Sequence, residues 1–512
     1  MIIGSLQEQL TSINNQLNVL TEQIALMNQR SYGRKTEQLE EIHQITMYDV
    51  FNEAEVLYDG SPEPEITEIN VSGHTRKKKT KREDKLEGLP ARIINHRLSK
   101  EELSALFPEG YKELPPVTYK RLSVIPQTFI VDEHHVHVYA SKSNDGRIVK
   151  AKRPKDVFRN STATVSLISA FITGKYLNHL PIERQVKCFN DNGADLESNT
   201  VAGWMINSVD YYFQELYDEL HRRLCTRKVI HADETPFRVI QDGRPAGSKS
   251  YMWVYRNGAC DQKHPIILFD HQSTRRLDHP DEFLKDFSGI LVTDGYQVYH
   301  SLSKKRDGLK VAGCWIHAKR KFAELVKAVG DSGGDTIVAK EATRRISHIF
   351  HLDNQLDDLP KVKREKERQR IVKPEVDDFF AWAKEAMLTV PPEGDTYKGL
   401  QYCINQEQYL RVFLSNGNVP MDNNPAEQAI RPFTVGRKNW VNIYSENGAS
   451  SSAVLYSIVE TAKANDLRIN DYLNFVLAEL VNHSDDTDRS FLYDLLPWSR
   501  EAKKKCARLQ KA

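Results

Sequence analysis

Two short stretches decide how the fold of this chain is interpreted: Val229-Ile-His-Ala-Asp233 and Ile290-Leu-Val-Thr-Asp294. Each has the apolar composition and length of a buried strand, and each ends in an aspartate. The first places Asp233 at or near the C-terminal part of a strand, and the second places Asp294 where a strand stops at a glycine. If the strands are neighbours, both carboxylates project at one end of a sheet, where divalent metal ions would neutralise them, as in a two-metal site for phosphoryl transfer. The alternative is that each aspartate only begins a turn or caps the next element.

The sequence around these stretches predicts a mixed α/β sheet. After Arg227 the hydrophobic pattern changes to a period of two, and a helical pattern at 281–287 interrupts the strands. The predicted strands cover residues 228–231, 250–256, 265–269, 289–293 and 310–314.

A third acid, Glu427, lies in Asp422-Asn-Asn-Pro-Ala-Glu427, which has the composition of a helix start. Asn424 is the expected N-cap, Pro425 the first helical residue and Glu427 the third. Two interpretations remain open. Glu427 either closes a capping box and pairs with Arg431, or it is a third metal ligand carried on a helix beside the sheet.

Basic and aromatic residues lie close to these acids in the sequence, as a polyanionic substrate would require. Solvated helical faces would give the same residue types. The candidate contacts to such a substrate are His317, Lys319, Arg320, Arg431, Arg437, Lys438 and Trp440. Among them, His317 and Arg431 are candidates for phosphate or transition-state contacts.

The N-terminal segments differ sharply in composition. Apolar residues follow heptad spacing from Leu6 to Met27, which predicts a dimeric coiled coil or, alternatively, an amphipathic helix packed on its own domain. Residues 52–90 are acidic and then basic, which predicts a flexible linker. Its cationic run at 76–82 either contacts phosphates or is a solvated spacer.

Strands are predicted at 117–124 and 128–140, and helices between 161 and 225. His134, His135 and His137 are expected on an ordinary exposed strand, because no cysteine or carboxylate cluster nearby completes a metal site. The helix, glycine-containing turn and helix at 180–204 have the pattern of a helix-turn-helix, which is also a common packing motif.

Composition limits the class of protein. The 512 residues are 28% charged and 40% apolar, enough for about three domains with real cores. The longest nearly apolar stretch, 165–172, is far shorter than the roughly 20 residues that span a bilayer. Six scattered cysteines form no CxxC pair, which fits a reducing, cytoplasmic location without zinc fingers. The net charge of +1 argues against a uniformly basic nucleic-acid coat.

Several of these segments, in this order, resemble the large transposase of the insertion sequence 66 family. The resemblance extends over nearly the whole chain, from the N-terminal heptads to Ile458-Val-Glu-Thr-Ala-Lys-Ala-Asn465. The segments that carry it most clearly are His231-Ala-Asp-Glu-Thr-Pro236, Val292-Thr-Asp-Gly-Tyr296, Gly313-Cys-Trp-Ile-His-Ala-Lys-Arg-Lys-Phe322, Asp422-Asn-Asn-Pro-Ala-Glu-Gln-Ala-Ile-Arg-Pro432 and Gly436-Arg-Lys-Asn-Trp440.

The resemblance implies a multidomain α/β protein with an RNase H-like catalytic core. Its expected parts are an N-terminal coiled coil (1–50), a flexible linker (51–90), a small β-rich domain (91–157), a helical, helix-turn-helix-like domain (158–226), the core (227–322 and 416–465), a helical insertion (323–415) and a C-terminal helical segment (466–512). Relatives commonly carry a cysteine-rich zinc-binding segment where this chain has residues 95–141 without any cysteine, so structural zinc is not expected there.

The resemblance also implies an activity: a bacterial, nucleoid-associated DNA transposase that cuts and joins DNA through a DDE triad of Asp233, Asp294 and Glu427. Two Mg²⁺ or Mn²⁺ ions would be the cofactors. Expected partners are the terminal inverted repeats, target DNA, a second copy of the chain or a higher oligomer, and small companion proteins of the same element. A catalytically silent DNA-binding or regulatory relative, a scaffold built on the coiled coil and a plain metal nuclease are the alternatives.

Overall fold

The computed structural model describes residues 129–140 and 148–508, apart from 246, 259–262 and 330–337, and a few separate residues between 93 and 115. The predicted coiled coil, the linker and the strand at 117–124 lie outside the described residues. The described residues belong to two compact units, the larger of which includes 153–506 and carries all three acids.

The smaller unit contains one two-stranded antiparallel ribbon. Strand β1 (Val138–Ala140) pairs with β2 (Ile148–Lys150), with Tyr139 opposite Val149. Of the predicted strand at 128–140, the structure assigns only Val138–Ala140 to a strand, so the prediction is wrong for residues 129–137. A strand requires a paired backbone, and here the partner extends over only three residues. His134, His135 and His137 are exposed.

A five-stranded mixed sheet forms the centre of the larger unit, as predicted. Its strands are β3 (Val229–Phe237), β5 (Ser250–Asn257), β6 (Ile267–Gln272), β7 (Gly289–Thr293) and β8 (Leu309–Gly313), in the order β6-β5-β3-β7-β8. Strands β3, β7 and β8 are parallel, whereas β5 is antiparallel to both of its neighbours. Helices α7 (Asp278–Phe283) and α8 (Gln297–Lys305) lie in the connections between β6, β7 and β8.

Strand β3 is longer than predicted, and this changes the position of Asp233. Its antiparallel pairing with β5 continues to Phe237 opposite Ser250, whereas its parallel pairing with β7 ends at His231 opposite Val292. Asp233 therefore lies in the middle of its strand, at the point where one neighbouring strand has ended. Periodicity missed this extension because Thr235-Pro236 resembles a turn.

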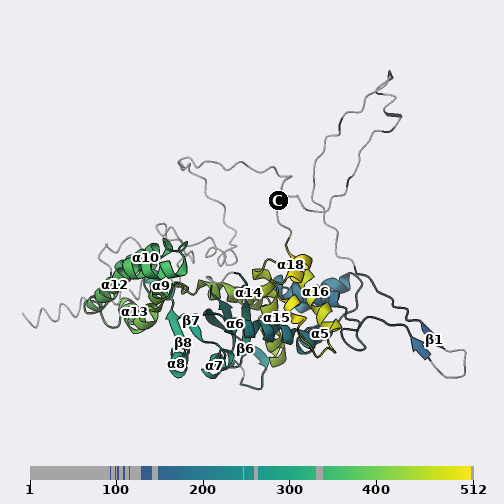
Figure 1. The fold of residues 1–512 in the computed structure, drawn as a ribbon, viewed down its shortest axis with the longest axis horizontal. Helices are drawn as coiled ribbons and strands as arrows, with labels where there is room; N and C mark the ends of the chain where they lie inside the picture. Colours follow the sequence, from purple (N-terminus) through teal and green to yellow (C-terminus); the bar gives the residue numbers. More distant parts are fainter. Residues whose placement is uncertain are drawn as a thin grey trace, which may run out of the picture. The chain divides into compact units, whose positions relative to one another are not determined.

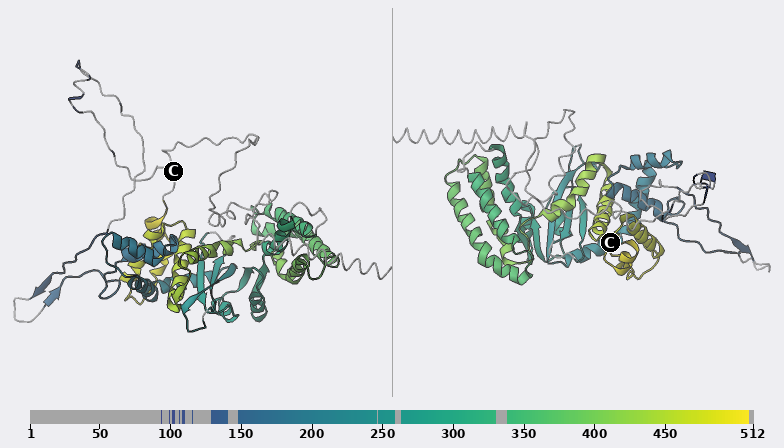
Figure 2. Two further views of the ribbon diagram at one scale, coloured as in Figure 1. Left: turned by 180° about the vertical axis from the view of Figure 1, so that it is seen from behind. Right: turned by 90° about the horizontal axis from the view of Figure 1, so that it is seen from above.

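Helices lie beyond both edge strands of the sheet, β6 and β8 (Figures 1 and 2). Beyond β6 lies the long buried helix α15 (Glu446–Ala464), which also contacts the N-terminal helices. These helices are α3 (Val165–Ile172), α4 (Ile182–Asp191), α5 (Ser198–Ser208) and α6 (Gln214–Cys225), with the π-helical turns η3 (Thr173–Leu177) and η4 (Val209–Phe213). The predicted helix, turn and helix at 180–204 are confirmed as α4, a turn at Gly193 with φ +93°, and α5.

The C-terminal helices α16 (Ile469–Asn482), α17 (Leu492–Leu495) and α18 (Arg500–Cys506) complete this side of the molecule. Helix α16 packs on α3, α15 and α18. No helix in the described ranges combines the length and the apolar composition needed to cross a membrane.

Beyond β8 lies a second helical layer, which is inserted between β8 and the segment that carries Glu427 (Figure 2). It comprises α9 (Trp315–Val329), α10 (Val338–Asn354), α11 (Lys361–Glu367), the π-helical turn η6 (Arg368–Val372), α12 (Lys373–Met387), α13 (Asp395–Leu410) and a 3₁₀ turn (Val412–Ser415). Trp315, Phe379 and Leu400 share one buried apolar cluster with Val292 and Ala312 of the sheet. The insertion and the sheet therefore have a continuous core.

Hydroxyl groups of α15 form hydrogen bonds with the outer backbone edge of strand β6. Ser457 Oγ accepts a hydrogen bond from Phe269 N at 2.7 Å. Thr461 Oγ1, four residues further along the helix, accepts one from Ile267 N at 3.0 Å and donates one to Ile267 O at 2.8 Å. These bonds satisfy backbone groups that an edge strand otherwise leaves without partners.

We expect Ser457→Ala and Thr461→Val each to lower the free energy of unfolding by about 1–3 kcal/mol, because each leaves a buried backbone N–H without a partner. Ser301→Ala on α8, whose hydroxyl donates to Gln297 O of its own helix, is the matched control and should change stability by no more than about 0.5 kcal/mol. Urea unfolding measures all three. Equal effects of the three substitutions would contradict this account of the sheet edge.

Candidate active site

Asp233 and Asp294 occupy equivalent positions on two adjacent parallel strands. The register pairs Val229 with Ile290 and His231 with Val292, so each paired residue of β3 lies beside the residue 61 positions later (290 − 229 = 61), and Asp233 and Asp294 each follow the last pair by two residues. The two aspartates have the same offset (294 − 233 = 61). Because the carboxyl ends of parallel strands meet at one edge, the register brings these two predicted residues together.

The two aspartates share a negatively charged environment. Burial, followed by the charges of Glu234, Asp294 and Glu427, raises the pKa of Asp233 well above its usual value. The backbone N–H of Glu234 donates to Asp233 Oδ1, and that of Tyr296 donates to Asp294 Oδ1, both at 2.9 Å. In the described part of the chain no basic side chain forms an ion pair with either carboxylate. Their remaining oxygen atoms are available to a cation.

Glu234, the next residue on β3, is neutralised by protein groups. Its side chain is 2% exposed and accepts a hydrogen bond from Arg275 Nε at 2.8 Å and one from the Tyr299 hydroxyl at 2.7 Å. Successive strand residues point to opposite faces, so Glu234 faces away from Asp233. The sequence analysis did not single out Glu234 or its partners, which come from a loop and a helix far along the chain.

The start of α14 (Asn424–Trp440) is anchored to β3 by Asn423. Its amide oxygen accepts a hydrogen bond from His231 Nδ1 at 2.9 Å, and its amide nitrogen donates to Ala232 O at 2.9 Å. Asn423 and His231 are fully buried. Burial lowers the pKa of His231 to about 4, so the imidazole is neutral. This anchor fixes the first turn of α14 beside Asp233.

The predicted cap of this helix is wrong by one residue. The N-cap is Asn423, without a side-chain capping bond, and Pro425 is the second helical residue. The side chain of Asn423 is used for the bond to β3 instead. Neither Asn423 nor His231 was among the predicted site residues, because no sequence signal connects positions 192 residues apart.

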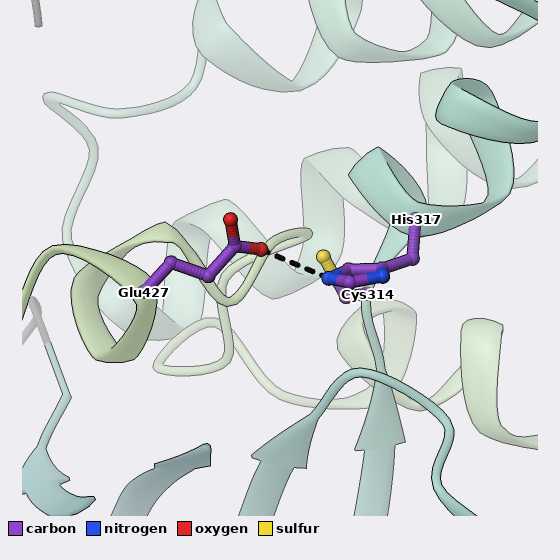
Figure 3. A group of neighbouring side chains, drawn as sticks. All are labelled: Cys314, His317 and Glu427. Carbon is purple, nitrogen blue, oxygen red and sulfur yellow. Dashed lines mark hydrogen bonds and ion pairs between the residues drawn. The ribbon is translucent and has the colours of Figure 1, made fainter. Parts of the chain in front are cut away.

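Glu427 contacts helix α9 (Figure 3). His317 Nε2 donates to Glu427 Oε1 at 2.9 Å, and Arg320 Nη2 donates to Oε2 at 3.3 Å. Burial favours the neutral acid, but the hydrogen bond from His317 and the charge of Arg320 outweigh it and lower the pKa of Glu427 to about 2. Glu427 is therefore an ionised group directed at α9 and not the acidic member of a capping box.

The other predicted substrate contacts lie at several places. Lys319 is on α9, where burial lowers its pKa. Arg437 on α14 donates to Pro236 O and, at 3.3 Å, to Thr235 Oγ1, both on β3. Lys438 is exposed, whereas the Trp440 ring packs 6.5 Å from that of Tyr456. Arg431 is partly buried on α14. Among the predicted cations, the structure thus brings His317 and Arg320 to Glu427.

A family model described as "Transposase IS66 family" matches residues 160–451, more than half of the chain and a range that includes all three acids. The chain belongs to the IS66 transposase family. The family resemblance inferred from the sequence is thereby confirmed. A second model, described as "Transposase C of IS166 homeodomain", matches residues 19–94.

Three curated relatives come from Sinorhizobium fredii, and each is named as an uncharacterized protein. The protein y4qI is 28% identical over 393 residues, covering 74% of this IS66-family chain and 70% of its own length. For y4hP the identity is 27% over 349 residues, covering 65% of this chain and 61% of the relative. For y4jD it is 24% over 396 residues, covering 75% of each.

We expect Asn423→Ala to lower the free energy of unfolding by about 1–3 kcal/mol, because it leaves His231 Nδ1 and Ala232 O buried without partners. Asn424→Ala, at the next position and partly exposed, is the matched control and should have an effect below about 0.5 kcal/mol. Denaturant unfolding of both variants provides the measurement. Similar values for the two would show that the Asn423 bridge does not anchor α14.

Proposed function

We propose that this protein is a DNA transposase that cuts at the ends of its element and joins the freed 3′-OH to target DNA. The observation that carries the proposal is the common register position of Asp233 and Asp294 on adjacent parallel strands, with Glu427 on the helix anchored to β3. Membership in the IS66 family supports the transposase role. The catalytic group is the triad Asp233, Asp294 and Glu427.

The core is RNase H-like in this proposal. A five-stranded mixed sheet in the order β6-β5-β3-β7-β8, with a single antiparallel strand beside β3, supports this assignment. So do the two acids on the adjacent strands β3 and β7 and the third acid on α14, which packs on β3 and β5. The helical insertion separates the second acid from the third in the sequence, and Asn423 connects the start of α14 to β3.

The residues fit a hard divalent cation. Asp233 and Asp294 keep carboxylate oxygens without basic partners among the described residues. Burial, followed by the charges of the neighbouring acids, raises the pKa of Asp233, a cost that a cation would reduce. Asp233, Asp294 and Glu427 would hold the ions, as Mg²⁺ and Mn²⁺ prefer oxygen ligands. Two bound ions would activate the attacking hydroxyl and stabilise the leaving oxygen of the phosphodiester.

The protein side chains have separate tasks in this scheme. Asn423 keeps the first turn of α14 beside β3, and His317 and Arg320 orient the Glu427 carboxylate. The helical segment 161–225 and the basic linker would bind the terminal repeats, and a coiled coil at the N-terminus would pair two copies. Small companion proteins of the same element would be further partners in this scheme.

The direct test is strand joining by the purified protein in Mg²⁺ or Mn²⁺, on linear DNA that carries the sequences flanking its gene. We expect joined product from the wild type and none from Asp294→Ala, which removes one metal-holding carboxylate but should still bind the ends. Asp307→Ala, at an exposed position between α8 and β8, is the control and should join DNA like the wild type.

Joined product from Asp294→Ala would contradict the triad. Tight binding of the ends by the wild type without any product would contradict the catalytic proposal and favour the silent DNA-binding alternative. Cleavage without joining would instead favour a metal nuclease.

Cation binding itself should depend on pH. Because burial and the neighbouring acids raise the pKa of Asp233, its carboxyl group keeps a proton to a higher pH than an ordinary aspartate does, and a cation must displace that proton. We therefore expect the Mn²⁺ affinity, measured by paramagnetic resonance of the free ion, to increase from about pH 5 to about pH 8. Asp233→Asn should bind Mn²⁺ more weakly and with less dependence on pH, and a wild-type affinity independent of pH would contradict this assignment.

A further inference from the structure

A second group of potential metal ligands lies beside the proposed triad (Figure 3). Cys314 precedes α9, His317 is in the first turn of α9, and Glu427 is in the first turn of α14. One ligand atom from each, a sulfur, a ring nitrogen and a carboxylate oxygen, lies within 4.8 Å of the other two. The group thus joins two segments that are more than 100 residues apart.

Backbone donors contact the buried Cys314 sulfur. It is fully buried, and it accepts hydrogen bonds from the backbone N–H of Asn423, at 3.2 Å, and from that of His317. Two N–H donors and the start of a helix favour negative charge on sulfur. Burial without a cation has the opposite effect and raises the pKa of the thiol to about 12.

The other two ligands are already oriented. Arg320 contacts Glu427 Oε2, which leaves Oε1 directed at His317, 2.9 Å from its Nε2. The side chains of His317 and Glu427 are 24% and 22% exposed, so they connect the buried sulfur to solvent. A cavity of about 240 Å³, whose lining includes His317, Arg320, Lys321, Glu324 and Asp395, opens beside the imidazole.

Sulfur, nitrogen and oxygen together select a particular class of metal. Mg²⁺ takes oxygen ligands, whereas Zn²⁺ and Co²⁺ combine cysteine, histidine and carboxylate ligands in four-coordinate sites. We propose that Cys314, His317 and Glu427 form a binding site for a borderline-soft divalent cation such as Zn²⁺, with water in the fourth position. This site shares Glu427 with the proposed hard-cation site and differs from it in Cys314 and His317.

Sharing Glu427 has a functional consequence, which rests on the proposed function. A Zn²⁺ ion held by Cys314 and His317 takes the carboxylate oxygen that the triad requires. The two proposed sites are therefore coupled through the Glu427 carboxylate.

The test is titration of the metal-free full-length protein with Co²⁺, followed by absorption spectroscopy. A cysteine-bound, four-coordinate Co²⁺ gives a sulfur-to-metal charge-transfer band and intense visible bands, and Zn²⁺ should abolish both by displacement. Cys314→Ser should lose the charge-transfer band, because the hydroxyl preserves the size and the hydrogen-bonding capacity of the thiol but not its sulfur. Glu427→Gln should keep the band and weaken Co²⁺ affinity about ten-fold or more.

Cys403→Ser is the matched control, because Cys403 is also a buried cysteine and lies in the apolar cluster of the insertion. This substitution should leave the spectrum unchanged. A folded wild type without the band, or a band that persists in Cys314→Ser, would overturn the proposal. These spectra require no DNA and no catalysis. A positive titration combined with failed strand joining would therefore reject the proposed function and leave this site standing.

Discussion

One buried amide, that of Asn423, determines where the third acid lies. Its oxygen and nitrogen bond to His231 and Ala232 on β3, while its backbone N–H bonds to Cys314 at the start of α9. A single residue thus connects the central strand, the end of β8 and the first turn of α14. Because each bond is buried, losing one leaves a polar group unpaired at a cost of about 1–3 kcal/mol, so the arrangement is strongly specified.

The charges at this junction are arranged unequally. Glu234 accepts hydrogen bonds from Arg275 and Tyr299. Glu427 accepts them from His317 and Arg320. Asp233 and Asp294 accept them from backbone N–H groups. Burial of the carboxyl group, and then repulsion by the neighbouring acids, raises the pKa of Asp233 well above its usual value. The fold therefore gathers carboxyl groups, one with a perturbed pKa and both without a basic partner among the described residues, at one end of the sheet, which is a feature expected of a functional site.

The helical insertion is a structural part of this site. Tyr402 of α13 donates to the carbonyl oxygen of Asp294 at 2.9 Å, and the Trp315 indole donates to Leu410 O at 2.8 Å. Gly295 has φ +96°, and a Cβ there would lie 2.7 Å from the Tyr402 hydroxyl, so only glycine lets α13 approach the second acid this closely. Deeper in the insertion, the fully buried Arg368 is paired with Asp353 and donates to three carbonyls of the returning segment. These bonds fix the segment 413–419, which leads from the insertion back to the sheet.

The sequence by itself determined the strands, the helices around them and the two aspartates, because periodicity and turn residues act over a few neighbouring positions. It also contained the spacing of 61 residues between Asp233 and Asp294, although only the sheet revealed that this number is the register of β3 against β7. Whether Glu427 caps its helix or faces α9 was decided by tertiary structure, since its partners His317 and Arg320 lie more than 100 residues away. The same holds for Asn423 and for the sulfur of Cys314, whose roles depend on contacts between segments that no local pattern connects.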